Sequence, residues 1–590
     1  RGLVTRVTDP LGGVLDLGYD ANGQMVSAAG PEGTTTGWTW SEGFLTAYQT
    51  PTHTTAYAYN GDGTLDTRSR PLGDTTYGYD DAGRLTSVQG GRSTSLTRDG
   101  AGRITAVADG LADLGVGYDD LGRVTSLSGP WGRTVGFAYD RVGNTTGITY
   151  ETGKAVSFTY DGDDRLSSVT DWNGRRTDYT YRPDGRLQRI DRPNGTWTVY
   201  DYDAAGRRVR LTHGGSGGTI ADYDYTLDAM GNPVAITGTE PLGPPEVVTG
   251  TADYTLNLAG QLVSDGATTY AYDGNGNLSS MSGSRNLALI FDRENRLTDL
   301  SGGASAAYLY DVFGNRRQAM RDGMTTRYVL DIRGMSQVLM ELDAAGTPTA
   351  YYIHGQGLLA RVRPDGTTHY YHGDGVGNVV AMTDDAGQVT HRYSYDPYGR
   401  VLDEVEADPN PFTYSGLHGV TREAADLYYM RARYYDARVG RFLGEDPVWS
   451  PDLYGYAKAN PVVWSDPLGT SPDLGDILKD TGKFAGYVVT FGNWFHEDMD
   501  AGTKTGVRYG RAVVKDFVPG AGGIILGADA AHGSIDLMRG DPEQVGTTVR
   551  TKLAKEAVKK GFKEAGATNG IPGFNTIWEI SRDLRGWWFE

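Results

Sequence analysis

Two aspartates, each followed by a proline, are the residues of this sequence best suited to chemistry. Asp446-Pro447 and Asp466-Pro467 lie twenty residues apart. Proline disfavours helical backbone at the residue before it, so each carboxylate is expected on an extended segment or turn that fixes its direction. If the loop between them brings the carboxylates together, they would share one proton, and one could act as base while the other donates. Aspartic peptidases activate water in this way. On residue type alone, both aspartates could equally cap turns.

The other groups that could do chemistry are scattered. Four histidines fall on different predicted hairpins, without the close spacing of a metal site and without a tight cluster of acidic residues. They are His354, His369, His372 and His391. We interpret them as structural, and the sequence predicts no metal and no other cofactor. Asp436, in "RYYDARVG", is a weaker third candidate for a catalytic carboxylate.

The elements that must position these groups appear as a repeat. The segments "YGYDDAGRLTSV" (77–88), "VGYDDLGRVTSL" (116–127) and "FTYDGDDRLSSV" (158–169) share one pattern, and most copies follow the previous one by 19–21 residues. Alternation before the Asp predicts a strand. Asp80 and Gly83 predict a tight turn, because Asp accepts from the backbone amides ahead of it and Gly tolerates a positive φ. Each copy is thus a β-hairpin that must pair edge to edge with its neighbours, giving a long spiral sheet.

The composition fits such an array. The chain has 590 residues, too many for one compact core, with 85 glycines and 38 tyrosines, as expected of short strands joined by tight turns. A net charge of −19 argues against nucleic acid as a partner of the shell surface. There is no cysteine for disulfides or thiol chemistry. No apolar run is long enough to span a membrane as an ordinary helix.

The composition changes abruptly near residue 470. Residues 1–470 hold two lysines and 36 tyrosines, whereas residues 471–590 hold nine lysines and two tyrosines. Two polypeptides of different character therefore meet here. The chain opens with "RGLVTRV", without Met or a signal peptide, which predicts a fragment or a processed piece.

The repeated "Y-D-x-x-G-R-L" pattern resembles the YD repeat of Rhs proteins, of the C subunits of bacterial Tc toxins and of teneurins. The resemblance implies an all-β fold in which hairpins wind into a hollow shell, with residues 1–330 as its repeats. Residues 331–411 contain longer, His-bearing hairpins such as "HYYHGDGVGNVVAMTDDAGQV", which resemble the end of such a shell.

Residues 412–470 resemble the core domain associated with Rhs repeats. The matching motifs are "LYYMRARYYD", "GRFLGEDP", "LYGYAKANP" and a closing "DPLG". In that family the core is an intramolecular aspartic protease that cuts just after the last motif. The resemblance implies Asp446 and Asp466 as the acid pair, Arg441 as a positioning or charge-tuning group, and a cleavage site at Thr470–Ser471. Thr470 stands where the family usually has Leu.

The segment 471–590 reads as mainly α-helical, with a lysine-rich amphipathic helix at 549–566. Its position implies an effector enclosed as cargo. The sequence leaves two interpretations of one polar motif in this segment open. The motif "WFHEDMD" contains His496, Glu497, Asp498 and Asp500, which could form a hydrolase centre or a solvated turn. The basic helix could lie on an anionic membrane or be a plain surface helix.

Taken together, the resemblance predicts a bacterial toxin shell, secreted or delivered to a cell surface, that releases its C-terminal effector by cutting itself. A secretion apparatus and an immunity protein are the implied partners. The alternative is a non-cleaving, teneurin-like or adhesive extracellular shell, whose aromatic hairpins contact carbohydrate or a partner cell.

Overall fold

The computed structural model describes the chain except for residues 1–2, 9–12, 31–32, 244–252, 451 and 471–590. The described part is almost entirely β-structure, in three antiparallel sheets of 23, 16 and four strands. This confirms the predicted all-β class. The expected helical segment 471–590 lies outside the described residues. No helix of the described chain is long and apolar enough to cross a membrane.

The first sheet is a meander in which every strand pairs with the next along the chain. Its first half comprises β1 (Arg6–Thr8), β2 (Val14–Tyr19), β3 (Met25–Ala29), β4 (Thr35–Ser41), β5 (Phe44–Gln49), β6 (Thr54–Tyr59), β7 (Leu65–Arg70), β8 (Gly73–Tyr79), β9 (Leu85–Gly90), β10 (Arg92–Arg98), β11 (Ile104–Ala108) and β12 (Leu114–Tyr118). Its second half comprises β13 (Val124–Ser128), β14 (Thr134–Tyr139), β15 (Thr145–Glu151), β16 (Lys154–Tyr160), β17 (Leu166–Thr170), β18 (Arg176–Tyr181), β19 (Leu187–Asp191), β20 (Trp197–Tyr202), β21 (Arg208–Gly215), β22 (Gly218–Leu227) and β23 (Pro233–Thr239).

The second sheet continues the same meander after residue 252. It comprises β24 (Thr255–Leu256), β25 (Leu262–Ser264), β26 (Thr268–Tyr272), β27 (Leu278–Gly283), β28 (Leu287–Phe291), β29 (Leu297–Gly302), β30 (Ala306–Tyr310) and β31 (Arg316–Arg321). It goes on through β32 (Met324–Asp331), β33 (Gln337–Leu342), β34 (Pro348–Gly355), β35 (Gly357–Val362), β36 (Thr368–Gly373), β37 (Val379–Thr383), β38 (Val389–Tyr395) and β39 (Val401–Val405). No break falls at residue 330, because β32 pairs with both β31 and β33.

One turn chemistry closes most hairpins. In the hairpin of β8 and β9, Asp80 Oδ1 accepts the N–H groups of Ala82 and Arg84, each at 3.0 Å, and Asp80 Oδ2 accepts Arg84 Nε at 2.8 Å. Gly83 has a φ of +72°, which a residue with a Cβ adopts only under strain. The predicted roles of Asp80 and Gly83 are therefore confirmed.

The tyrosine of each copy ties it to the copy before. Tyr118 Oη donates to the Ile104 carbonyl at 2.8 Å, and the Arg103 guanidinium lies 4.5 Å from the Tyr118 ring centroid. The same hydroxyl-to-carbonyl bond recurs at Tyr59, Tyr139, Tyr160, Tyr181, Tyr202, Tyr272 and Tyr310. Adjacent hairpins are thus joined by side chains as well as by strand pairing.

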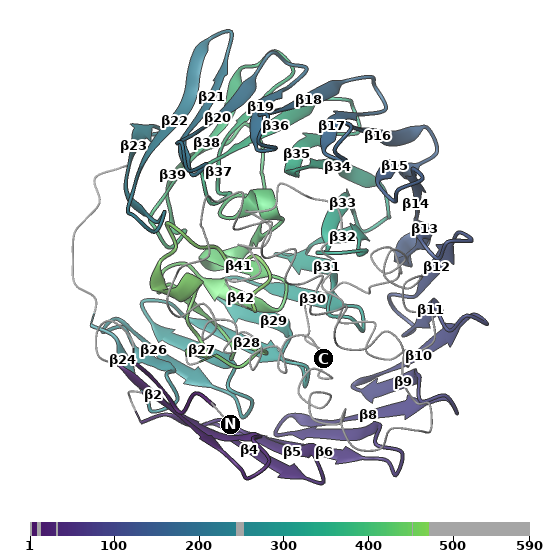
Figure 1. Ribbon diagram of the computed structural model, residues 1–590, viewed down its shortest axis with the longest axis vertical. Coiled ribbons are helices and arrows are strands. Elements are labelled where there is room, and N and C mark those ends of the chain that lie inside the picture. Colours follow the sequence, from purple (N-terminus) through teal and green to yellow (C-terminus); the bar gives the residue numbers. More distant parts are fainter. Residues whose placement is uncertain (1–2, 9–12, 31–32, 244–252, 451, 471–590) are drawn as a thin grey trace, which may run out of the picture.

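The two large sheets follow each other around a ring (Figure 1). Strands β2–β8, β9–β14 and β16–β22 trace the bottom, right and top of the view, and β24–β39 follow the same course. Hydrogen bonds connect the first large sheet to the second. Arg293 Nη1 donates to the Asp74 carbonyl, Tyr150 Oη to the Tyr352 carbonyl and Arg175 Nη1 to the Gly366 carbonyl, across separations of 219, 202 and 191 residues.

The third sheet lies near the middle of the ring, where β41 and β42 are labelled in Figure 1. It comprises β40 (Thr421–Arg422), β41 (Leu427–Met430), β42 (Arg433–Asp436) and β43 (Arg441–Phe442), within the predicted core domain. Four short 3₁₀ helices complete the described chain: η1 (Pro130–Gly132), η2 (Gly416–His418), η3 (Ala424–Asp426) and η4 (Ala457–Ala459).

Buried aromatic side chains hold this core sheet against its surroundings. The rings of Tyr435 and Tyr456 lie 4.3 Å apart, and both pack around Phe442. A buried carboxylate adds an ionic joint, since Glu423 pairs with Arg316 and Arg321 of β31, each at 2.7 Å. The core sheet is therefore fixed to the second large sheet.

Candidate functional site

The two predicted aspartates meet at one guanidinium. Arg433 Nη2, at the start of β42, lies 2.8 Å from Asp446 Oδ2 and 3.4 Å from Asp466 Oδ2. Both carboxylates are buried, with side-chain exposures of 6% and 1%. Two acids beside a single cation leave one negative charge in excess, which favours a proton held between them. This arrangement could serve acid–base chemistry.

Arg433 is held on every side. Its Nε donates to the Gly469 carbonyl at 2.6 Å, its Nη1 donates to the Leu453 carbonyl at 3.0 Å, and its guanidinium carbon lies 3.6 Å from the centroid of the Phe442 ring. The guanidinium therefore joins the acid pair, the loop between the two aspartates and the chain leading to residue 470.

Burial sets the proton affinity of the pair. The pKa of Asp446 is raised to about 7, mainly because the carboxylate is removed from water, and the neighbouring Asp466 charge raises it further. The Arg433 charge opposes the shift. Asp446 is therefore partly protonated near neutral pH, as a group that donates a proton must be.

The predicted cleavage segment runs directly past the pair. Three successive carbonyls are bound: Pro467 by Arg431 Nη1 at 2.6 Å, Leu468 by the Ala432 N–H at 3.0 Å, and Gly469 by Arg433. The Thr470 N–H donates to Asp466 Oδ1 at 3.1 Å. Thr470 is buried, and Ser471 lies outside the described residues. The structure thus brings the chain up to residue 470 against one of the two acids.

Glycine is the only residue type that fits at position 469 of this segment. Its φ is +69°, and a Cβ there would come within 2.5 Å of the Met430 carbonyl oxygen. The segment therefore depends on glycine to pass so close to the β41–β42 turn.

Arg441, predicted as the positioning group, lies elsewhere. Its Nη2 donates to the Gly260 carbonyl at 2.7 Å and lies 3.5 Å from Asp452 Oδ1. The guanidinium that contacts both carboxylates is Arg433, which sequence reasoning missed. A signal was present: the hairpin "LYYM-RA-RYYD" carries two arginines among buried aromatics, and a buried arginine needs acidic or carbonyl partners.

Asp436, the weaker third candidate, does not join the pair. Its carboxylate forms an ion pair with Arg285, which lies between β27 and β28. Because both side chains are buried or nearly so, this pair forms a second joint between core and shell.

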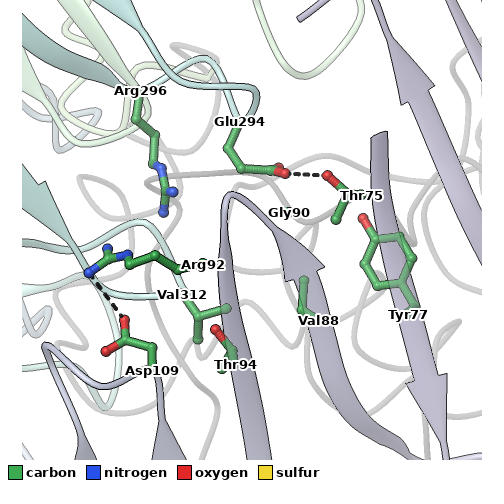
Figure 2. A pocket seen from close by; sticks show the side chains of 10 residues that line it. All are labelled: Thr75, Tyr77, Val88, Gly90, Arg92, Thr94, Asp109, Glu294, Arg296 and Val312. Atoms are coloured by element: carbon green, nitrogen blue, oxygen red, sulfur yellow. Dashed lines mark hydrogen bonds and ion pairs between the residues drawn. The ribbon is translucent and has the colours of Figure 1, made fainter. Parts of the chain in front are cut away.

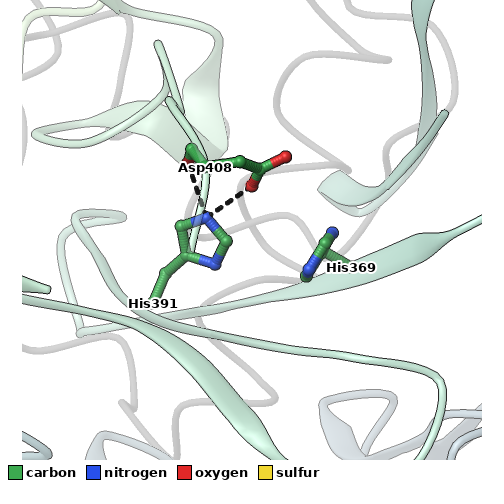
Figure 3. Close-up of side chains that lie close together, drawn as sticks. All are labelled: His369, His391 and Asp408. Atoms are coloured by element: carbon green, nitrogen blue, oxygen red, sulfur yellow. Dashed lines mark hydrogen bonds and ion pairs between the residues drawn. The ribbon is translucent and has the colours of Figure 1, made fainter. Parts of the chain in front are cut away.

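His369, His391 and Asp408 come together in one cluster, with ligand atoms within 4.8 Å of one another (Figure 3). The sequence spacing did not indicate this cluster, in which a single acid, Asp408, lies 2.9 Å from His391 Nε2 through its Oδ1. Asp408 also pairs with Arg361 and Arg363. The positive charges of these two arginines disfavour the binding of a metal cation at Asp408. We therefore interpret the cluster as a structural contact that fixes residue 408 to the sheet.

The other two histidines make separate hydrogen bonds. His354 Nε2 lies 2.8 Å from the Val338 carbonyl oxygen, and His372 Nε2 lies 2.9 Å from Thr383 Oγ1. Burial lowers the pKa of both rings, which keeps them neutral. They are part of the packing of β33–β37.

A polar pocket marks the contact between the two turns of the ring (Figure 2). Glu294 accepts from Thr75 Oγ1 at 2.6 Å and pairs with Arg68, and Arg92 lies 3.7 Å from Asp109. The Glu294 contacts cross from the second sheet to β7 and β8, whereas Arg92 and Asp109 both belong to the first sheet's stretch of chain. Because these charges are paired, we interpret the pocket as a structural contact between the two sheets.

A spiral of YD-type hairpins around a buried aromatic core defines a class of shell protein. The chain belongs to the teneurin YD-shell family, whose model matches residues 168–462, and RHS repeat models match residues 1–35, 79–113, 118–155 and 139–176. The resemblance predicted from the repeats is therefore confirmed.

Relatives in sequence include nucleases and toxins. The chain is 31% identical over 260 residues to the tRNA3(Ser)-specific nuclease WapA of Bacillus spizizenii. This match covers 42% of this chain and 11% of that protein. It is 27% identical over 245 residues to the toxin protein Tse5 of Pseudomonas aeruginosa, covering 34% and 18%. The chain thus spans about a tenth of the length of the WapA relatives.

Among solved structures, a chain of the Tc holotoxin pore of Photorhabdus luminescens has the same fold, with a TM-score of 0.62 and 16% identity. The match covers 78% of this chain and 30% of that one. A TcdB2-TccC3-Cdc42 complex gives a TM-score of 0.57, with 17% identity over 81% and 31% of the two chains.

Proposed function

We propose that this chain is the shell and self-cleaving core of a bacterial polymorphic toxin. The shell encloses residues 471–590 as an effector, and the core cuts the Thr470–Ser471 bond once, in cis. The observation that carries the proposal is the buried acid pair on Arg433, with the Thr470 N–H bound to one of its members.

The chemistry follows from the two environments. Asp466 accepts a proton from the attacking water, and the water oxygen bonds to the Thr470 carbonyl carbon. Asp446, protonated because of burial, gives its proton to the Ser471 nitrogen as the carbon–nitrogen bond breaks. The pair holds one proton before and after the reaction. The new carboxyl group of Thr470 passes its proton to the new amino group of Ser471, so the products are a Thr470 carboxylate and a Ser471 ammonium group.

Thr470 in place of the family's usual Leu is compatible with this role. The segment is bound through its backbone, at three carbonyls and one N–H, so its position does not depend on a large apolar side chain at 470.

The relatives support the wider setting. WapA and Tse5 are named as a nuclease and a toxin, and the segment after the core differs in composition from the shell. We propose that the protein is secreted or delivered to another cell, with a secretion apparatus and an immunity protein as partners. What residues 471–590 act on is a separate question, tested by expressing them alone in a bacterium and following growth.

The test of self-cleavage is a denaturing gel of the purified 590-residue chain beside Asp446→Asn and Asp466→Asn. A wild-type fragment of 120 residues, 471–590, that both variants lack is the expected result. An intact wild type would contradict the proposal and favour the teneurin-like shell. The match of the teneurin YD-shell model to residues 168–462 is the observation behind that alternative.

A further inference from the structure

The turn that carries Asp446 is anchored from outside the core domain. The anchoring residues belong to β4, β5 and the loop after β5, which we call the N-terminal anchor (residues 35–53). Two side chains that flank Asp446 contact this anchor: Glu445 on one side and Trp449 on the other.

Glu445 binds the loop of the N-terminal anchor. Its Oε1 accepts from Thr52 Oγ1 at 2.5 Å and from Thr50 Oγ1 at 3.4 Å, and its Oε2 lies 3.8 Å from His53 Nδ1. Glu445 and His53 side chains are only 7% and 5% exposed. The Thr52 bond joins residues 393 positions apart in the chain.

Trp449 packs on the strand of the same anchor. Its ring centroid lies 5.4 Å from that of Trp38, with the planes at 77°, an edge-to-face contact of the favourable kind. Trp38 is itself buried in β4. The short segment 445–449 is therefore attached to the N-terminal anchor at both ends.

Asp446 lies between these two attachments and faces the other way. Its N–H donates to the Leu453 carbonyl at 2.8 Å, and its Oδ1 accepts the Val448 N–H at 2.9 Å, so carboxylate and turn move as one unit. Adjacent side chains in extended backbone point in opposite directions, which is why Glu445 reaches the anchor while Asp446 reaches Arg433.

Asp466, by contrast, is held by core residues. Its carboxylate binds Arg433 Nη2 and the Thr470 N–H, both of which belong to residues 412–470. The turn of Asp446 thus depends on the core together with the first repeats.

We propose that the N-terminal anchor positions Asp446, with Thr52 as the principal positioning residue, so that the acid pair is completed only when the first repeats have docked on the core. This inference rests on the proposed self-cleavage. Its consequence is an order of events: the effector is severed after the ring has closed around the core, and not before.

The experiment follows cleavage of the newly made 590-residue chain as a single-turnover rate. Thr52→Val keeps the shape of the side chain and removes the hydroxyl; about tenfold slower cleavage is expected, because small displacements of a catalytic group cost large factors in rate. Thr52→Ser restores the hydroxyl and should restore the rate. Thr64→Val is the matched control, since Thr64 Oγ1 also donates to a carboxylate, Asp62, in an exposed hairpin turn.

Limited proteolysis and thermal melting of each variant, in an Asp466→Asn background that prevents cleavage, show whether the fold is intact. Should Thr52→Val fail to fold, Trp449→Leu tests the other attachment and is expected to slow cleavage likewise. Wild-type rates in a folded Thr52→Val or Trp449→Leu chain would overturn the inference while leaving self-cleavage in place. A wild type that never cleaves refutes self-cleavage itself, so the two failures are distinct.

Discussion

The backbone N–H of Thr470 donates to Oδ1 of Asp466, 3.1 Å away and four residues earlier in the chain. The bond closes the "DPLG" turn on its own carboxylate, and Arg433 holds that turn from the other side. Residue 470 is therefore placed by the same acid that we propose to activate water.

Arg433→Lys should abolish most of the cleavage. A lysine ammonium is a point charge and cannot bind both carboxylates, the Leu453 carbonyl and the Gly469 carbonyl together. We expect about a hundredfold slower cleavage and a lower melting temperature. Arg441→Lys, at a residue that contacts neither acid through a described bond, serves as the comparison and should cleave at nearly the wild-type rate.

Cleavage should slow as the pH rises through neutrality. The pKa of Asp446 is raised to about 7 by burial, and the proposed reaction needs this group protonated. Above that pH the protonated fraction falls, so the rate should fall about tenfold for each further pH unit. Single-turnover rates from pH 6 to 9 measure this, and a rate that stays level up to pH 9 would contradict the assigned role.

Glu445→Gln should make stability less dependent on pH. Burial raises the pKa of Glu445 from 4.5 to about 7, so between these values the folded state holds a proton that the unfolded chain has lost. Stability from this group is present below about pH 4.5 and is lost as the pH rises to about 7. Denaturant unfolding at pH 5 and pH 8, in an Asp466→Asn background that prevents cleavage, should show a smaller difference in the Gln variant.

Gly469→Ala should dislodge the cleavage segment. The left-handed backbone at this position costs a residue with a Cβ about 1–2 kcal/mol, and the approach to the Met430 carbonyl adds a steric clash. We expect loss of cleavage and faster proteolysis around residues 467–470. Gly61→Ala is the control, because a Cβ at Gly61 would meet nothing within 4 Å.

Tyr118→Phe should weaken the repeat by a small, defined amount. The variant keeps the ring beneath Arg103 and loses the bond to the Ile104 carbonyl, which is worth about 1 kcal/mol. Tyr160→Phe removes the equivalent bond to Thr145, two hairpins further along. Because the two sites share no partner, the losses in the free energy of unfolding should add. Chemical denaturation of the single and double variants measures them.

The local features were predictable because short-range chemistry fixes them. Period-two alternation and the Asp80-to-Gly83 turn are set within one hairpin, and the structure follows them. Arg433 was not predictable in the same way. Its contact with both acids depends on the Met430–Arg433 register of a two-residue turn and on the path of residues 446–470 around it.

Contacts between distant parts of the ring were harder still to predict from the sequence. Thr52 meets Glu445 because a certain number of hairpins completes one passage around the ring. The sequence of a single repeat does not reveal that number. For the same reason, the sequence spacing of His369, His391 and Asp408 gave no sign that they would meet.

The ring's long-range contacts also restrict how this chain can change over time. Duplicating or deleting one copy of about twenty residues within the first circuit would keep every local pairing intact. It would nevertheless bring Tyr150 opposite a different partner from Tyr352, and it would move the loop at Thr52 away from Glu445. Copy number in the first circuit is therefore under structural constraint, whereas outward loop tips are free to lengthen.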